Sequence, residues 1–485
     1  MTRRRLSVSV LGLIVAGAAA TSAFEQQQQP PAPDRSSPPA VGPQPELRVP
    51  AVDRRTLANG LKVWIVPSHK VPLAHAQLAF KAGTGIDPTG KFGLSSLTAD
   101  MLDEGAGTRS ALEVADAIDF LGADLSTRTT DDASFIDLHV PSARLADALP
   151  IMADVVMHPT FAAGDLDRLR KERLTSLIEA QDDPEQLVQL AFPRLLFGPT
   201  ARYGTSGIGT ASTIQSFTPD DLKKFHSTYY VPGNALLVVT GDVTADTLVP
   251  QLEQTFHGWT GTPPTMTPPA VPASSAARKI YLVDKPGAAQ SQIRIGSIGV
   301  ARSTPDYFPL RVLNTILGGS FSSRLNANLR EQHGYAYGAF STFDMRLAPG
   351  PFYASAGVQT DKTSEALHEF FVELTRIREP IPDGELKRAA NFLSLLLPRN
   401  FETTQGVATS MSQLFVYSLP DDFYTTYADR VRAVTAADVK RVADKYIVPD
   451  KLTVVIVGDR KTIEPGIRAL NLGPLTVVEA GAVVK

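Results

Sequence analysis

The stretch that decides the fold is TPDDLKKFHSTYYVPGNALLVVTGDV, residues 218–243, because it occurs again as TAADVKRVADKYIVPDKLTVVIVGDR at residues 435–460. The two stretches align without a gap at a constant offset of 458 − 241 = 217 residues. Identical residues stand where a strand begins and where a turn ends it, at Pro232 and Pro449, Gly241 and Gly458, and Asp242 and Asp459. The chain is therefore predicted to contain two copies of one module.

The composition supports two globular domains and argues against a nucleic-acid partner. The chain has 485 residues, 43% of them hydrophobic, which is more than a single hydrophobic core usually takes. A formal net charge of -3 offers no basic surface for nucleic acid or for an anionic membrane. The chain has no cysteine, so we expect neither disulfide bonds nor a cysteine for lipid attachment.

The N-terminus has the pattern of a secretory signal. Arg3, Arg4 and Arg5 precede an apolar stretch, residues 6–20, that is shorter than the ~20 residues a spanning helix needs. Residues 1–23 are therefore expected to be a cleaved signal peptide, and the mature protein is expected to be periplasmic, without a membrane span. The Gln- and Pro-rich residues 24–48 are expected to form a disordered tether.

A second change of composition divides the mature chain. The segment GTPPTMTPPAVPASSA, residues 261–276, is predicted to be an extended linker between an N-terminal domain over residues 49–260 and a C-terminal domain over residues 277–475. Both domains mix strand and helix periods. Leu61, Val63 and Ile65 alternate as in a strand, whereas Leu94, Leu97 and Met101 recur with helical spacing. The expected fold class is α+β in both copies.

Several segments together resemble the pitrilysin or insulinase-like zinc metallopeptidases, family M16. They are LANGLKVWIV, KFGLSSLTADMLDEGAGT, LGGSFSSRLNANLREQHGYAYGAFST and the two strands that end in Gly-Asp. The resemblance spans nearly the whole mature chain, from about Val49 to Leu472. It implies two homologous domains, each a mainly antiparallel sheet with helices packed on it, that close like the halves of a clam shell.

In that family, a helix of the first half carries the zinc motif His-x-x-Glu-His. The matching register puts Ser96 and Asp100 at the His positions and Ala99 at the Glu position. Serine is a negligible zinc ligand, a lone aspartate is a weak one, and alanine cannot take a proton. No two of the eight His residues lie three or four residues apart, so no other helical His pair exists. We therefore expect no metal and no other cofactor in this chain.

The remaining candidates for ligands are predicted to be ordinary surface residues. Glu172, or in another register Glu179, falls where the distal carboxylate ligand of the family would stand, and without the His pair either is expected to be a solvated helix carboxylate. Asp100, Asp103 and Glu104 are likewise expected to form a solvated helix end, and His69 and His75 to be surface residues. Gly318, Gly319 and Ser320 are expected to form a helix C-terminus with a tight turn.

The second half retains a pair that the family uses. There, an Arg and a Tyr reach across the closed chamber to hold the peptide and to stabilise the tetrahedral oxyanion. Arg330 and Tyr337, in LREQHGYAY, match that pair in type and spacing, and Tyr335 is the alternative if the register slips by two. A guanidinium and a phenol are suitable donors to a carbonyl oxygen that gains charge.

The resemblance thus implies a non-catalytic, substrate-binding subunit of a heterodimeric, exported zinc metalloendopeptidase that acts on peptides. The partner would be a homologous subunit with an intact His-x-x-Glu-His motif and a bound zinc ion, and Arg330 and Tyr337 would act on it in trans. The alternative is a catalytically idle peptide-binding or scaffold protein of the same fold. Neither hypothesis expects metallopeptidase activity from this chain alone.

Overall fold

The structure is a computed structural model that describes residues 47–483. The described residues belong to one compact unit, which holds both copies of the module. The predicted signal peptide and nearly all of the predicted tether lie outside the described residues. No helix of the described part is long and apolar enough to cross a membrane.

The first half contains a six-stranded sheet. Its strands are β1 (Asp53–Thr56), β2 (Lys62–Pro67), β3 (Leu73–Phe80), β4 (Asp124–Thr129), β5 (Ser134–Pro141) and β6 (Ala235–Gly241). Its helices are α1 (Leu94–Asp100), α2 (Ala111–Phe120), α3 (Leu145–Met157), α4 (Ala163–Glu179), α5 (Pro184–Phe197), α6 (Ala211–Ser216), α7 (Pro219–Tyr229) and α8 (Ala245–Thr255). The strand order is β1-β2-β6-β3-β5-β4, in which β2 and β6 are parallel and all other neighbours are antiparallel.

The second half contains the second six-stranded sheet. Its strands are β7 (Lys279–Asp284), β8 (Gln290–Ile298), β9 (Ala336–Phe343), β10 (Pro351–Gln359), β11 (Thr453–Gly458) and β12 (Leu475–Val478). Its helices are α9 (Tyr307–Leu317), α10 (Arg324–Asn326), the π-helical turn η5 (Ala327–Gln332), α11 (Thr363–Arg376), α12 (Asp383–Leu396), α13 (Thr404–Val416), α14 (Tyr427–Arg432), α15 (Ala436–Tyr446), α16 (Arg460–Ala469) and α17 (Ala480–Val483). The strand order is β12-β7-β11-β8-β10-β9, with β7 parallel to both of its neighbours.

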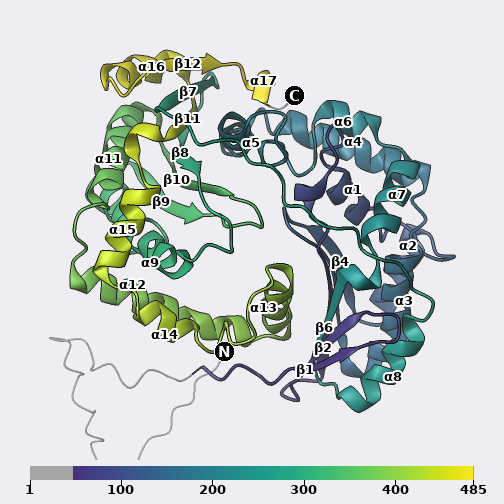
Figure 1. The fold of residues 1–485 in the computed structure, drawn as a ribbon. Helices are drawn as coiled ribbons and strands as arrows, with labels where there is room; N and C mark the ends of the chain where they lie inside the picture. Colours follow the sequence, from purple (N-terminus) through teal and green to yellow (C-terminus); the bar gives the residue numbers. More distant parts are fainter. Residues whose placement is uncertain (1–46, 484–485) are drawn as a thin grey trace, which may run out of the picture. The chain divides into compact units, whose positions relative to one another are not determined.

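The internal repeat extends through both sheets (Figure 1). The offset found in the sequence recurs between β2 and β7, 279 − 62 = 217. Pairing relates β5 to β10 by one residue more, 355 − 137 = 218, because Gln77 pairs with Asp137 and Arg294 pairs with Ser355. The inner strand order is the same in both halves, and only the strand beyond β2 or β7 differs, because β1 precedes its sheet in the chain whereas β12 follows. The prediction of two α+β copies, each with a mainly antiparallel sheet, is confirmed. The predicted linker lies in a stretch between α8 and β7 that has no helix or strand.

Local sequence signals set the ends of these elements. Ser110 accepts a hydrogen bond from the backbone N–H of Glu113, and the Glu113 carboxylate accepts one from the Ser110 backbone in return, so α2 begins there. Gly241 ends β6 with φ +118°, and a Cβ at this position would lie 2.1 Å from the Leu73 carbonyl oxygen. Only glycine fits this turn.

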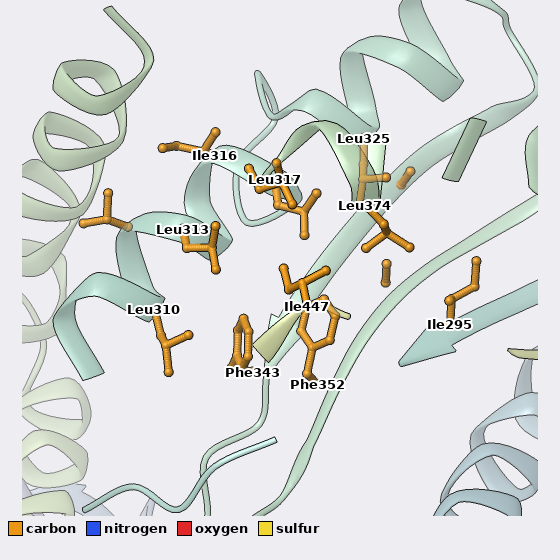
Figure 2. Packing of buried hydrophobic residues seen from close by; sticks show 14 of the residues in the cluster. Ile295, Leu310, Leu313, Ile316, Leu317, Leu325, Phe343, Phe352, Leu374 and Ile447 are labelled. Carbon is orange, nitrogen blue, oxygen red and sulfur yellow. The ribbon is translucent and has the colours of Figure 1, made fainter. Parts of the chain in front are cut away.

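Apolar side chains between the helices and the second sheet form the larger core. Leu310, Leu313 and Leu317 recur on one face of α9 and are fully buried. They lie beside Phe343 and Phe352, whose ring centroids are 4.5 Å apart (Figure 2). Full burial of each of these side chains stabilises the fold by about 1.5–3 kcal/mol.

One helix of each half packs on the sheet of the other half. Helix α5 contacts β11 and β8, and α13 contacts β6 and β3. The two helices are equivalent in the repeat, since 404 − 217 = 187 falls within α5. Leu187 and Phe192 of α5 are buried together with Val455 and Val457 of β11, so the exchange covers apolar faces of both sheets.

A buried carboxyl group also links the halves. Oδ2 of Asp132 accepts hydrogen bonds from the Tyr417 hydroxyl group (3.0 Å) and the Leu347 backbone N–H (3.1 Å), both in the second half. Oδ1 of Asp132 accepts one from the Tyr203 hydroxyl group (3.3 Å). Burial raises the pKa of Asp132 from 3.8 to about 6 in spite of these donors. Ionisation of Asp132 is therefore less favourable in the folded protein than in the unfolded chain.

The substitution Asp132→Asn tests this link through the pH dependence of stability. Because the folded pKa of Asp132 lies above the unfolded value of 3.8, its contribution to the free energy of unfolding is complete below about pH 4. It is lost as pH rises through about 6, by up to about 3 kcal/mol. We expect Asp132→Asn, which does not titrate, to remove this part of the slope in urea titrations between these two pH values. The control Asp119→Asn, at an exposed site on α2, should keep the slope; an unchanged slope in Asp132→Asn would contradict the assignment.

Candidate functional site

Helix α1 carries the three changed positions of the zinc motif. Its N-terminus is fixed by the buried side chain of Asp87, whose carboxylate oxygens accept hydrogen bonds from the backbone N–H groups of Gly93 (2.7 Å) and Ser95 (2.8 Å). Burial raises the pKa of Asp87 to about 7. The cap holds α1 in the orientation in which Ser96 and Asp100 face α4.

A guanidinium group lies between the two positions that would carry the zinc-binding His residues. Arg173 of α4 donates hydrogen bonds to Ser96 Oγ (3.1 Å) and Asp100 Oδ2 (2.5 Å). It also donates to the carbonyl oxygens of Gly93 (3.2 Å) and Ile208 (3.2 Å). The Arg173 side chain is only 7% exposed. A fixed positive charge thus stands beside Ser96 and Asp100.

The residues at this place do not fit a zinc ion. A cation bound by Ser96 and Asp100 would be repelled by the Arg173 guanidinium, and Asp100 would have to give up its ion pair. Ala99 is buried and offers no base. Within residues 47–483, no group of three or more His, Asp or Glu side chains is arranged to hold a metal ion.

The structure also shows how the other acidic candidates lie. Glu172 forms an ion pair with Arg168 (3.0 Å) and is 56% exposed, as expected of a solvated carboxylate. Glu179 is exposed as well. The expectation of a solvated helix end is wrong, because Glu104 also pairs with Arg168 (2.5 Å) and burial raises the pKa of Asp103 to about 6.

His69 and His75 differ in their surroundings. His69 is exposed and contacts Asp242 with a ring nitrogen (2.6 Å), as predicted for a surface residue. The prediction is wrong for His75, which is 2% exposed and lies 3.1 Å from Asp137. The cause is α13, which covers the face of β3 that the sequence alone leaves open.

The structure brings Arg330 and Tyr337 together. Arg330 lies on η5, and Tyr337 is the second residue of β9 and is 89% exposed. The Arg330 guanidinium carbon is 5.2 Å from the Tyr337 ring centroid and 4.5 Å from that of Phe321. Both rings hold the guanidinium by cation–π attraction. Tyr335, the alternative tyrosine, instead stacks on His333 and packs against the core.

Arg330 and Tyr337 line an open cavity of about 1000 Å³ on the second sheet. The lining includes the exposed aromatic side chains of Phe321, Phe340 and Phe392 and the polar ends of Gln290 and Gln292. From the first half it takes only Glu185 and Val188 of α5. The cavity therefore has the size and the mixture of apolar and polar groups that a peptide or another small ligand requires.

Close packing behind Arg330 and Tyr337 fixes the cavity wall. Helix α9 ends at Leu317, as predicted, and Gly318 lies against β9. A Cβ at Gly318 would lie 2.3 Å from the backbone nitrogen of Ser341, so a larger residue would push the wall away from the strand. The sequence analysis missed Phe340, Phe392 and Arg173 as site residues. The one signal that could have identified the two phenylalanines is that each is a large apolar residue at a position that faces solvent.

The fold and these two sites define a protein of two α+β modules with an aromatic cavity in the second module and no zinc ligands on the helix of the first. Two family models match it: "Insulinase (Peptidase family M16)" over residues 62–201 and "Peptidase M16 inactive domain" over residues 216–393. The chain belongs to peptidase family M16, as the resemblance predicted.

Relatives of the chain include proteins described as peptidases and one described as a non-peptidase. An uncharacterized zinc protease of Mycobacterium leprae is 30% identical over 305 residues, 61% of this chain and 67% of the relative. A non-peptidase homologue of Helicobacter pylori is 23% identical over 408 residues, 83% of this chain and 93% of the relative. The crystal structure of a peptidase M16 inactive domain from Pseudomonas fluorescens superposes with a TM-score of 0.78 at 26% identity, covering 84% of this chain and 98% of that one.

The substitution Arg173→Met tests whether the guanidinium stabilises the degenerate zinc helix. It leaves the Asp100 carboxylate and the Ile208 carbonyl oxygen without this donor, whereas the Gly93 carbonyl oxygen keeps the Leu97 N–H (3.0 Å), so we expect the free energy of unfolding in urea to fall by about 2–3 kcal/mol. The control Arg168→Met removes the ion pairs of a largely exposed guanidinium on the same helix, with Glu104 and Glu172, and should cost less than about 1 kcal/mol. Equal losses in the two variants would contradict a special role for Arg173.

Proposed function

We propose that this chain is the non-catalytic, substrate-binding subunit of a heterodimeric, exported zinc metalloendopeptidase that acts on peptides. The observation that carries the proposal is the Arg330 and Tyr337 pair on an open, aromatic cavity in a chain whose own zinc helix is blocked by Arg173. The partner is a homologous subunit with an intact His-x-x-Glu-His motif, which holds the zinc ion. The predicted signal peptide supports export to the periplasm.

The geometry of the pair suits a role in transition-state stabilisation. The Phe321 and Tyr337 rings lie beside the guanidinium of Arg330, and its Nε pairs with Glu331 (3.3 Å), which leaves the terminal N–H groups for an acceptor. In the proposed complex, these N–H groups and the Tyr337 hydroxyl group donate hydrogen bonds to the carbonyl oxygen of the bond that is cleaved in the partner's zinc site. Donors fixed before the reaction stabilise the charge that develops on this oxygen.

The outer strand of the second sheet is partly unavailable for pairing with a peptide strand. The backbone N–H of Ala339 already donates to Asn326 Oδ1 (3.2 Å), and that of Ser341 donates to the Gly318 carbonyl oxygen (3.1 Å). A peptide that adds a strand to β9 would have to break both hydrogen bonds. In the proposed complex, the cavity of this chain therefore contacts the peptide mainly through side chains, with aromatic rings that take apolar groups.

The alternative is a catalytically idle scaffold of the same fold. A scaffold has no chemical use for an exposed tyrosine hydroxyl group beside a guanidinium, whereas a divided enzyme does. The name of the Helicobacter pylori relative, a non-peptidase homologue, agrees with both hypotheses, because neither assigns activity to this chain alone. The two differ in the effect of Tyr337 on turnover by the assembled complex.

The substitution Tyr337→Phe separates them, because it keeps the ring beside Arg330 and removes only the hydroxyl group. The assay follows cleavage of a quenched fluorescent peptide by this chain, by a zinc-motif homologue from the same cell, and by their mixture, with zinc content measured in each. We expect activity in the mixture, and we expect Tyr337→Phe to reduce its kcat by about 100-fold. Assembly, measured by size-exclusion chromatography, should not change.

The matched control is Tyr335→Phe, which removes the hydroxyl group of the neighbouring tyrosine that stacks on His333. It should leave kcat within about twofold of the unsubstituted complex. A complex that assembles and cleaves equally well with Tyr337→Phe would refute the role of Tyr337 in trans. A complex that forms without any activity would favour the scaffold.

A further inference from the structure

The floor of the cavity carries a third charged group, Arg294 of β8. Along this strand the side chains of Ser291, Ile293 and Ile295 are fully buried on one face. The alternating residues Gln290, Gln292 and Arg294 lie on the other face and line the cavity. Arg294 thus reaches the cavity from the middle of the sheet, whereas Arg330 reaches it from η5.

Arg294 has no anionic partner in contact with it. Within residues 47–483 it forms no ion pair, and its buried Nε has no hydrogen-bond partner. Its guanidinium carbon lies 4.6 Å from the ring centroid of Tyr353, which covers one face of the group. Burial lowers the pKa of Arg294, and Glu185 at the start of α5 offsets this only in part. A buried guanidinium donor without an acceptor is costly, and a bound anion would remove that cost.

In the first half, the side chain at the position equivalent to Arg294 finds its hydrogen-bond partners within the protein. The repeat relates Arg294 to Gln77, since 294 − 217 = 77. Gln77 donates a hydrogen bond to Asp137 (2.6 Å) and accepts one from Ser412 of α13 (2.6 Å). On β10 the residue paired with Arg294 is Ser355, just as Asp137 is paired with Gln77 on β5, so the second half lacks that carboxylate. The second half therefore has the guanidinium of Arg294 in place of the Gln77 amide, without a carboxylate at the paired position to neutralise it.

We propose that Arg294 binds a carboxylate group of the ligand in this cavity, either the C-terminal carboxylate of a peptide or an acidic side chain. The inference rests on the proposed function for the presence of a peptide. The charged residues of the lining are Arg294, Arg330 and Glu185, which gives the cavity a net positive charge. A guanidinium binds a carboxylate through two parallel hydrogen bonds, and the amide groups of Gln290 and Gln292 lie beside it as further donors.

The test measures binding of short peptides to the full chain by fluorescence anisotropy, with an uncharged fluorophore at the N-terminus. Three peptides share one apolar sequence: one has a free C-terminus, one is amidated, and one is amidated and contains a single glutamate. We expect the free acid, the glutamate peptide or both to bind roughly tenfold or more tightly than the amidated peptide. The comparison of the two carboxylate peptides identifies which source of the carboxylate the site prefers.

The substitution Arg294→Gln should reduce that preference to about twofold or less and leave binding of the amidated peptide nearly unchanged. The control Arg468→Gln changes an exposed arginine of α16 outside the cavity and should keep the full preference. Thermal unfolding of each variant checks that it is folded. A preference that survives Arg294→Gln overturns the proposal. Equal binding of all three peptides also overturns it but leaves the proposed function intact, and no binding of any peptide refutes both.

Discussion

The reciprocal packing of α5 and α13 is the interaction on which the rest of the structure depends. Each helix leaves its own half and covers part of the sheet of the other half. The apolar side chains that it buries would otherwise face water, and each contributes about 1.5–3 kcal/mol. Because α5 also carries Glu185 and Val188 into the cavity, the contact that joins the halves also shapes the candidate binding site.

The two halves share one backbone fold but differ in the polar side chains on the sheet face near the exchanged helix. Under α13, the polar residues of β3 are satisfied within the protein, since Gln77 contacts both Asp137 and Ser412. Near α5, the equivalent face of β8 opens into the cavity, and Arg294 has no such partner. Duplication of a module with later divergence of a few side chains is sufficient to produce one closed face and one binding face.

At the degenerate zinc motif, too, a few side chains change the charge of the site. Two imidazole ligands and a divalent cation are replaced by Ser96, Asp100 and the guanidinium of Arg173, which supplies the positive charge from the protein itself. The sequence showed that ligands were missing from α1. It did not show the replacement, because Arg173 lies 173 − 100 = 73 residues from Asp100 and meets it only through the packing of α4 on this side of α1.

Local patterns were sufficient for much of the fold. The alternating residues Val63 and Ile65 lie in β2, and Leu94 and Leu97 lie in α1, as their periods predicted. The prediction failed for His75, a polar residue on a strand whose two faces are both covered. Strand periodicity distinguishes two faces of a strand, but it does not show which distant helix covers the second one.

The sequence by itself determined the duplication, the α+β class, the family and the absence of the zinc-binding pair, because each of these depends on residue identity or on spacing within a short segment. Only the tertiary structure decided that Tyr337 rather than Tyr335 faces the cavity beside Arg330, that Arg173 fills the place between Ser96 and Asp100, and that Arg294 lacks an anionic partner. These facts depend on contacts between residues far apart in the chain, whose side chains meet only after the two sheets and their exchanged helices have packed.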